Sequence, residues 1–198
     1  MVSAYTPLSS TPLDKGVFIY QPDQPMNAVS LEDPATAVMT DLRRVSAVTV
    51  ELDVTLETAS QRMKQRGVRL LLVTGAGGAV VGLITSTDLQ GEKPMQHIQK
   101  NGGRWSELLV KDIMTSQEKL EVLCMADVER ARVGNIVATM KRAGRQHALV
   151  VDRMYAGGSQ MVRGIYSAAE IARKLDMEIQ ANEVVQTFAE IEKLLMSA

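Results

Sequence analysis

The chain has 198 residues, of which 23% are charged, and its formal net charge is −1. This length allows one large domain or two small ones, and the balanced charge excludes the broad basic surface that gathers nucleic acid or anionic membranes. Cys124 is the only cysteine, so the chain can form neither an internal disulfide nor a thiolate metal cage, and we expect no metal site. The sequence shows no signal-peptide pattern and no apolar run of about 18 residues, which predicts a soluble, cytoplasmic protein.

Residues 1–35 are predicted to form an extended, proline-rich arm. Five of the six prolines lie there, and proline suits neither helices nor the interior of sheets. Within the arm, the apolar residues 17–20 either dock as a short strand or belong to a mobile tail. The sequence leaves both alternatives open.

The next segment, residues 36–103, is predicted to fold as one small unit. Alternation and β-branched residues indicate its strands, and apolar residues at helical spacing indicate its main helix, which Gly67 ends. The expected elements, in chain order, are a strand at residues 45–50, a helix at 55–66, strands at 70–73 and 79–84, a helix after Thr85 and a short helix from Pro94.

Residues 104–176 are predicted to contain a linker, which Trp105 opens, and a second unit of the same kind. The order of strand, helix, strand, strand and helix is the same as in the first unit. The expected elements are a strand at residues 120–123, a helix at 133–143, strands at 147–151 and 162–166, and a helix at 168–175.

Residues 177–198 are predicted to form an added C-terminal helix. Four apolar side chains recur on one helical face, namely Val184, Phe188, Ile191 and Leu195. This stripe must be covered, either by the helix's own domain or by a second chain in a dimer.

Three sequence motifs occur twice, in the same order, and indicate an internal duplication. The motif VMT at residues 38–40 is answered by IMT at residues 113–115, MKQRG at 63–67 by MKRAG at 140–144, and GLITSTD at 82–88 by GIYSAAE at 164–170. Two copies of one small unit therefore form a paired module.

These motifs, with GRQHALVVD at residues 144–152, resemble those of a CBS-domain pair, also called a Bateman module, over about residues 36–176. The resemblance implies an α/β (α+β) fold in which two β-α-β-β-α repeats pack with pseudo-twofold symmetry. It implies two clefts that bind adenosine-containing ligands such as AMP, ADP, ATP or S-adenosylmethionine. It also implies a stand-alone regulatory module, commonly a homodimer, that acts on an unknown protein partner and requires no cofactor.

The two duplicated turns are the main candidate sites. In the first, a strand runs into a helix whose free N–H groups attract phosphate, and the Thr85 hydroxyl adds a donor. Asp88 can accept hydrogen bonds from two ribose hydroxyls, although the same spacing is a helix capping box. We favour ligand contact for Asp88. We favour capping for Ser167 and Glu170, because Glu is the usual capping-box partner, and we therefore expect one nucleotide per chain.

Further ligand-binding candidates surround these turns. Arg69 is a candidate phosphate contact, because a guanidinium offers paired donors. His147 stands where the family often carries histidine, usually as a packing residue. The remaining candidates are expected to line an adenine slot, by the resemblance or because a flexible thioether suits a planar ring: Met39, Thr40, Val45, Leu70, Leu72 and Met114.

We expect no enzymatic activity, because no acid, base and nucleophile can be grouped from the sequence. The leading hypothesis is a sensor, in which an adenine nucleotide binds between the repeats and changes a surface offered to a partner. The alternative is a ligand-independent scaffold that dimerises, with both turns serving only as helix caps. Nucleotide binding distinguishes the two hypotheses.

Overall fold

The computed structural model describes residues 29–153 and 158–175, together with Pro12 and Lys15. Most of the predicted arm, including residues 17–20 with their two open alternatives, and the predicted C-terminal helix lie outside the described residues. The end of the arm lies against the C-terminal half, since the Val29 N–H donates to the carbonyl of Lys174 at 3.1 Å.

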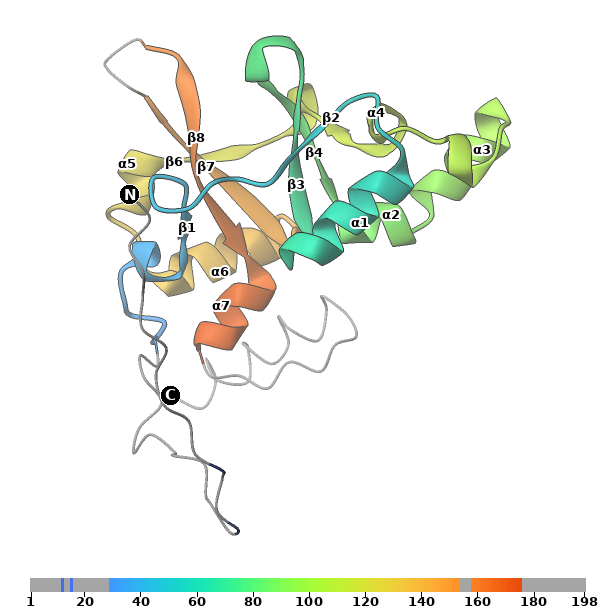
Figure 1. Cartoon of the computed structure of the whole chain (residues 1–198). Coiled ribbons are helices and arrows are strands. Elements are labelled where there is room, and N and C mark those ends of the chain that lie inside the picture. Colours follow the sequence, from blue (N-terminus) through green and yellow to red (C-terminus); the bar gives the residue numbers. More distant parts are fainter. Residues whose placement is uncertain (1–11, 13–14, 16–28, 154–157, 176–198) are drawn as a thin grey trace, which may run out of the picture.

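Two four-stranded sheets with equivalent strand order form the fold (Figure 1). In each sheet the middle two strands are antiparallel, a parallel strand flanks one side and a two-residue strand flanks the other. The first sheet contains β2 (Thr49–Glu51), β3 (Leu70–Thr74), β4 (Val80–Thr85) and β5 (Thr115–Ser116). The second contains β6 (Val122–Cys124), β7 (His147–Arg153), β8 (Gln160–Ser167) and β1 (Thr40–Asp41).

The main helices follow the sequence prediction closely, and the expected mixed α/β fold is confirmed. The predicted helix at residues 55–66 begins where the Thr55 hydroxyl accepts from the Thr58 N–H, and it ends at Gly67 with φ of 63°. The α-helices are α1 (Leu56–Arg66), α2 (Ser86–Gln90), α3 (Lys93–Asn101), α4 (Val110–Ile113), α5 (Met125–Val128), α6 (Val133–Arg142) and α7 (Ala168–Lys174). Single 3-10 turns occur at η1 (Ala35–Val38), η2 (Ala76–Gly78), η3 (Trp105–Glu107) and η4 (Gln117–Lys119).

One predicted strand is much shorter in the structure. Residues 45–50 were expected to be extended by their alternation, but only Thr49–Glu51 pair, in parallel, with β3. Val45 lies in a turn instead, where its N–H donates to the Asp41 carbonyl at 3.2 Å and half of its surface is exposed. Alternation alone does not provide a neighbouring strand, and here the neighbour is available for three residues only.

The short first strand of each repeat joins the sheet of the other repeat. Thr40 in β1 pairs with Ile165 in β8, and Thr115 in β5 pairs with Leu83 in β4. We call the sheet of β2 to β5 with α1 and α2 the first unit, and the sheet of β6 to β8 and β1 with α6 and α7 the second unit. The division into repeats at residues 36–103 and 104–176 remains a prediction. Each sheet combines strands from both of these ranges.

The exchange places the glycine of each duplicated turn under a crossing segment. A Cβ added to Gly164 would lie 2.4 Å from the Sδ of Met39, and one added to Gly82 would lie 2.5 Å from the Thr115 carbonyl oxygen. A glycine at these positions therefore serves close packing, and neither has a positive φ.

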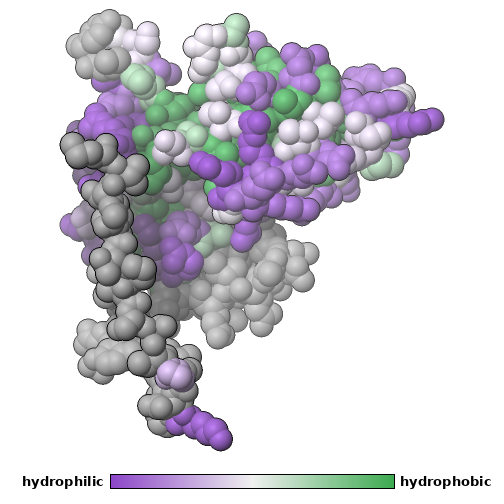
Figure 2. Space-filling model, viewed as in Figure 1, coloured by the Kyte–Doolittle hydropathy of each residue, from purple (hydrophilic) through white to green (hydrophobic). Residues whose placement is uncertain are grey.

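Each unit has its own apolar core, and a third, smaller cluster joins the two sheets. The joining cluster contains Leu70, Leu72 and Leu149. Hydrophilic side chains cover the part of the surface where α1 lies (Figure 2). None of the helices in the described ranges is long and apolar enough to cross a membrane.

Candidate ligand-binding cleft

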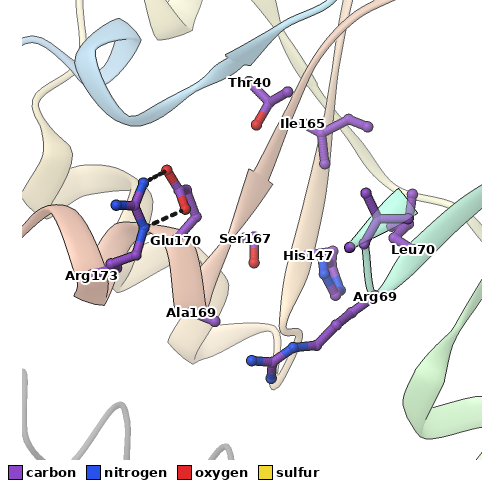
Figure 3. A pocket seen from close by; sticks show the side chains of 11 residues that line it. Thr40, Arg69, Leu70, His147, Ile165, Ser167, Ala169, Glu170 and Arg173 are labelled. Atoms are coloured by element: carbon purple, nitrogen blue, oxygen red, sulfur yellow. Dashed lines mark hydrogen bonds and ion pairs between the residues drawn. The ribbon is translucent and has the colours of Figure 1, made fainter. Parts of the chain in front are cut away.

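A cleft of about 550 Å³ opens between the two units, next to the start of β3 and the end of β8. Its walls combine apolar side chains with hydroxyl, carboxylate, imidazole and guanidinium groups (Figure 3). The lining residues are Thr40, Gly67, Val68, Arg69, Leu70, His147, Ile165, Ser167, Ala169, Glu170 and Arg173.

The strand register explains how residues far apart in sequence meet here. His147, at the start of β7, pairs with Ser167, at the end of β8, and Thr40 pairs with Ile165 on the other side of that strand. The first unit supplies Arg69 and Leu70 from the start of β3. The cleft therefore lies between the two units, and each unit supplies one of its walls.

His147 is the one titratable cleft residue whose protonation is strongly perturbed within the described chain. Its pKa is lowered from 6.5 to about 4, chiefly by burial and then by the positive charge of Arg69, while Asp88 opposes the shift. The imidazole is consequently neutral at pH 7. A neutral ring can both donate and accept a hydrogen bond, as polar recognition of a base requires.

Glu170 and Arg173 form a bidentate ion pair on the wall of the cleft. The Arg173 Nε donates to Glu170 Oε2 at 3.0 Å and its Nη2 donates to Oε1 at 2.7 Å. This contact raises the pKa of the guanidinium. The Ser167 hydroxyl makes no capping hydrogen bond at the start of α7, so it remains available to the cleft.

The equivalent residues of the first turn are engaged in a capping box. The backbone N–H of Thr85 donates to Asp88 Oδ2 at 2.8 Å, its hydroxyl donates to the same oxygen at 2.7 Å, and the Asp88 N–H donates back to that hydroxyl at 3.3 Å. The Lys93 ammonium holds the other carboxylate oxygen at 2.5 Å. Both oxygens of Asp88 therefore have protein partners.

The structure assigns the helix cap to the other turn than the sequence favoured. Capping was favoured for Ser167 and Glu170, and this prediction was wrong: the helix has no side-chain cap at Ser167, and the Glu170 carboxylate pairs with Arg173. Asp88, for which ligand contact was favoured, forms the cap. A direct ligand contact by Asp88 or Thr85 stays a prediction, and neither residue lines the cleft described here.

The structure also regroups the other predicted site residues. Thr40, Arg69, Leu70 and His147 join Ser167 and Glu170 in the cleft, whereas the sequence grouped several of them with Asp88. The remaining four lie elsewhere in the structure. Met39 is buried in the core of the second unit, Met114 packs on the core of the first, Leu72 lies between the sheets and Val45 lies in the exposed turn.

Sequence reasoning missed five cleft residues, of which Arg173 matters most. A signal was present, because Glu followed by Arg three residues later on a helix is a known ion-pair spacing. The alternation of β8 could also have indicated that Ile165 and Ser167 share a face. The other three missed residues are Gly67, Val68 and Ala169.

In the part of the chain that the structure describes, no set of side chains is arranged to bind a metal ion. No group of three or more His, Cys, Asp or Glu side chains is close enough to hold an ion there. The cleft can instead accommodate an organic molecule of nucleotide size, since ligand pockets commonly span about 300 to 1,000 Å³.

One protein family matches part of the chain. The CBS-domain family model matches residues 35–92, and both units have the corresponding order of strands and helices. The chain thus contains a CBS domain at residues 35–92, and its described part has the fold of solved CBS-domain structures. No curated protein matches the chain in sequence.

Several solved structures share the fold. An uncharacterized conserved protein from Pyrococcus horikoshii is 19% identical over 78% of this chain and 100% of its own, with a TM-score of 0.54. The structure of CBSX2 in complex with AMP is 18% identical over 71% of this chain and 94% of its own, with a TM-score of 0.50. The CBS domain NE2398 is 18% identical over 71% and 96%, with a TM-score of 0.50. These low identities relate the proteins by fold alone.

Proposed function

We propose that this protein is a regulatory module that binds an adenosine-containing ligand in the cleft between its two CBS units. The observation that carries the proposal is the mixed lining of the cleft by both units. AMP is the first candidate, and ADP, ATP and S-adenosylmethionine are the others. The known complex of CBSX2 with AMP supports this class of ligand.

The lining residues match the three parts of a nucleotide. Apolar side chains can hold the base, hydroxyl and carboxylate groups can bind the ribose, and guanidinium groups can bind phosphate. In that order, the residues are Val68, Leu70 and Ile165 for the base, Thr40, Ser167 and Glu170 for the ribose, and Arg69 and Arg173 for the phosphate.

A ligand in this cleft contacts both units, so it can regulate by favouring one of their arrangements. The shift is limited to the difference in its affinity for the two arrangements. The proposal assigns the module no reaction. Its homodimer, its cytoplasmic location and its regulated protein partner remain predictions that accompany this function.

The test is a calorimetric titration of the full chain with AMP, ADP, ATP and S-adenosylmethionine. We expect saturable binding of at least one, with one ligand per chain. Ser167→Ala should weaken that binding about fivefold, because one hydroxyl contact is lost. The matched control, Thr85→Ala, changes the equivalent hydroxyl of the first turn and should leave the affinity unchanged.

Thermal unfolding provides an independent readout of the same interaction. A ligand at about 100 times its dissociation constant should add about 2.7 kcal/mol to the free energy of unfolding. If none of the four ligands binds the folded wild-type protein, the ligand-independent scaffold replaces the sensor. If Thr85→Ala rather than Ser167→Ala abolishes binding, the ligand belongs to the first turn.

A further inference from the structure

The ion pair between Glu170 and Arg173 occupies the groups that a nucleotide would need. Both side chains line the cleft, and each carboxylate oxygen accepts from the guanidinium, at 3.0 and 2.7 Å. In Figure 3 the pair stands on the wall opposite Leu70, with Ser167 between them. In the structure, therefore, the carboxylate of the cleft and one of its two guanidinium groups bind each other.

We propose that Arg173 changes partner when the ligand binds. It leaves the Glu170 carboxylate for the ligand's phosphate, and Glu170, thereby released, accepts hydrogen bonds from the ribose hydroxyls. This inference rests on the proposed nucleotide function of the cleft. It makes the phosphate a requirement for full use of the ribose contact.

The exposure of the two side chains makes the exchange feasible. The Arg173 side chain is 69% exposed and the Glu170 side chain 33% exposed, and ion pairs in such surroundings hold weakly, because water screens them. A phosphate carries more charge than a carboxylate and accepts the same bidentate hydrogen bonds. The phosphate is accordingly the stronger partner for Arg173.

The surroundings of Glu170 also leave it free to turn toward a ligand. Its carboxylate accepts from Arg173 and takes no part in a helix cap. Asp88, its counterpart in the first turn, is only 12% exposed and is fixed by the cap and by Lys93. The second turn alone thus combines a releasable acid with a releasable arginine.

The partner exchange predicts a preference for nucleoside monophosphates over nucleosides. A nucleoside such as adenosine finds Glu170 already paired and gives Arg173 no new partner. AMP supplies the phosphate that releases Glu170. Removing the arginine should consequently affect the two ligands in opposite directions.

The experiment titrates the full chain, wild type and Arg173→Gln, with AMP and with adenosine. We expect Arg173→Gln to weaken AMP binding about tenfold, because a charge-assisted contact is lost. We expect it to strengthen adenosine binding about twofold, because Glu170 becomes free. Arg173→Lys should fall between, since an ammonium keeps the charge but loses the bidentate geometry.

The matched control is Arg130→Gln. Arg130 also forms an exposed ion pair with an acid three residues earlier, Asp127, but lies outside the cleft. This variant should change the affinity for neither ligand.

Two results would overturn the partner exchange while leaving the proposed function standing. In one, Arg173→Gln weakens AMP and adenosine by the same factor, which indicates a structural role in α7. In the other, it changes neither affinity. Wild-type protein that binds neither compound, nor any of the other adenosine ligands, removes the proposed function together with this inference.

Discussion

The two duplicated turns use one sequence pattern for two different purposes. In the first, Thr85 and Asp88 cap α2 and Lys93 takes the remaining carboxylate oxygen. In the second, the Ser167 side chain makes no capping hydrogen bond, and Glu170 binds Arg173 at the edge of a cleft. A cation binds the acid in both turns, yet only the acid of the first also completes a helix cap, so the shared motif does not by itself fix the role of its acid.

The residues around the two turns also differ at equivalent positions of the repeats. The duplicated motifs place Gln146 opposite Arg69 and Leu70 opposite His147 in the two repeats. Counting from Asp88 and Glu170, Gly91 corresponds to Arg173. The cleft beside the second turn therefore has two guanidinium groups where the equivalent positions of the first offer an amide and a glycine.

The largest expected effect concerns the histidine that distinguishes the repeats. The folded pKa of His147 is lowered to about 4, so between pH 6.5 and 4 the unfolded chain binds a proton that the folded chain does not. Stability present above pH 6.5 is lost across this window, by about 3 kcal/mol. His147→Leu copies the residue of the first repeat and should remove this loss.

Urea unfolding of wild type and His147→Leu at pH 7 and at pH 4 measures this difference. The other titrating groups are common to both proteins and cancel in the comparison. An equal loss of stability in the two proteins would show that His147 does not stay neutral in the fold.

A somewhat smaller effect is expected where the exchanged strands cross the glycines of the two turns. Gly82→Ala should cost about 2 kcal/mol, because its Cβ meets a backbone oxygen of Thr115. Gly164→Ala should cost about 1 kcal/mol, because it meets the flexible side chain of Met39. Double-mutant cycles check this: Met39→Val should relieve Gly164→Ala, whereas Met114→Val should relieve Gly82→Ala much less. Equal relief at both sites would contradict the explanation that Gly82 is confined by backbone and Gly164 by a flexible side chain.

The smallest effect separates capping from ligand binding directly. Thr85→Ala should lower the free energy of unfolding by about 1 kcal/mol, as expected for loss of an N-cap. Ser167→Ala should change it by less than about 0.5 kcal/mol, because that hydroxyl makes no capping bond. Thermal denaturation of the two variants without ligand makes the comparison. A larger cost for Ser167→Ala would indicate that it caps α7 after all.

Local patterns predicted most of the fold because their physical causes are local. Apolar spacing and the Gly67 cap gave the helix α1 to within one residue, and the buried run at residues 70–73 gave β3. Two-residue strands such as β1 and β5 carry no periodicity and were missed. Half of the predicted ligand residues line the cleft. The positions of the others could not be predicted, because the grouping depends on which sheet each short strand joins.

The sequence by itself determined the duplication, the family and the kind of side chains available for a ligand. Repeated motifs, turn glycines and helical spacing involve residues that are close along the chain, so they can be recognised from the sequence alone. Only the tertiary structure decided that the second turn lines the described cleft and that the acid of the first turn is held in a cap. Those outcomes depend on how β3 of the first unit, with Arg69 beside it, packs next to the end of β8 and the start of α7, and no local pattern specifies the packing of elements so far apart in the sequence.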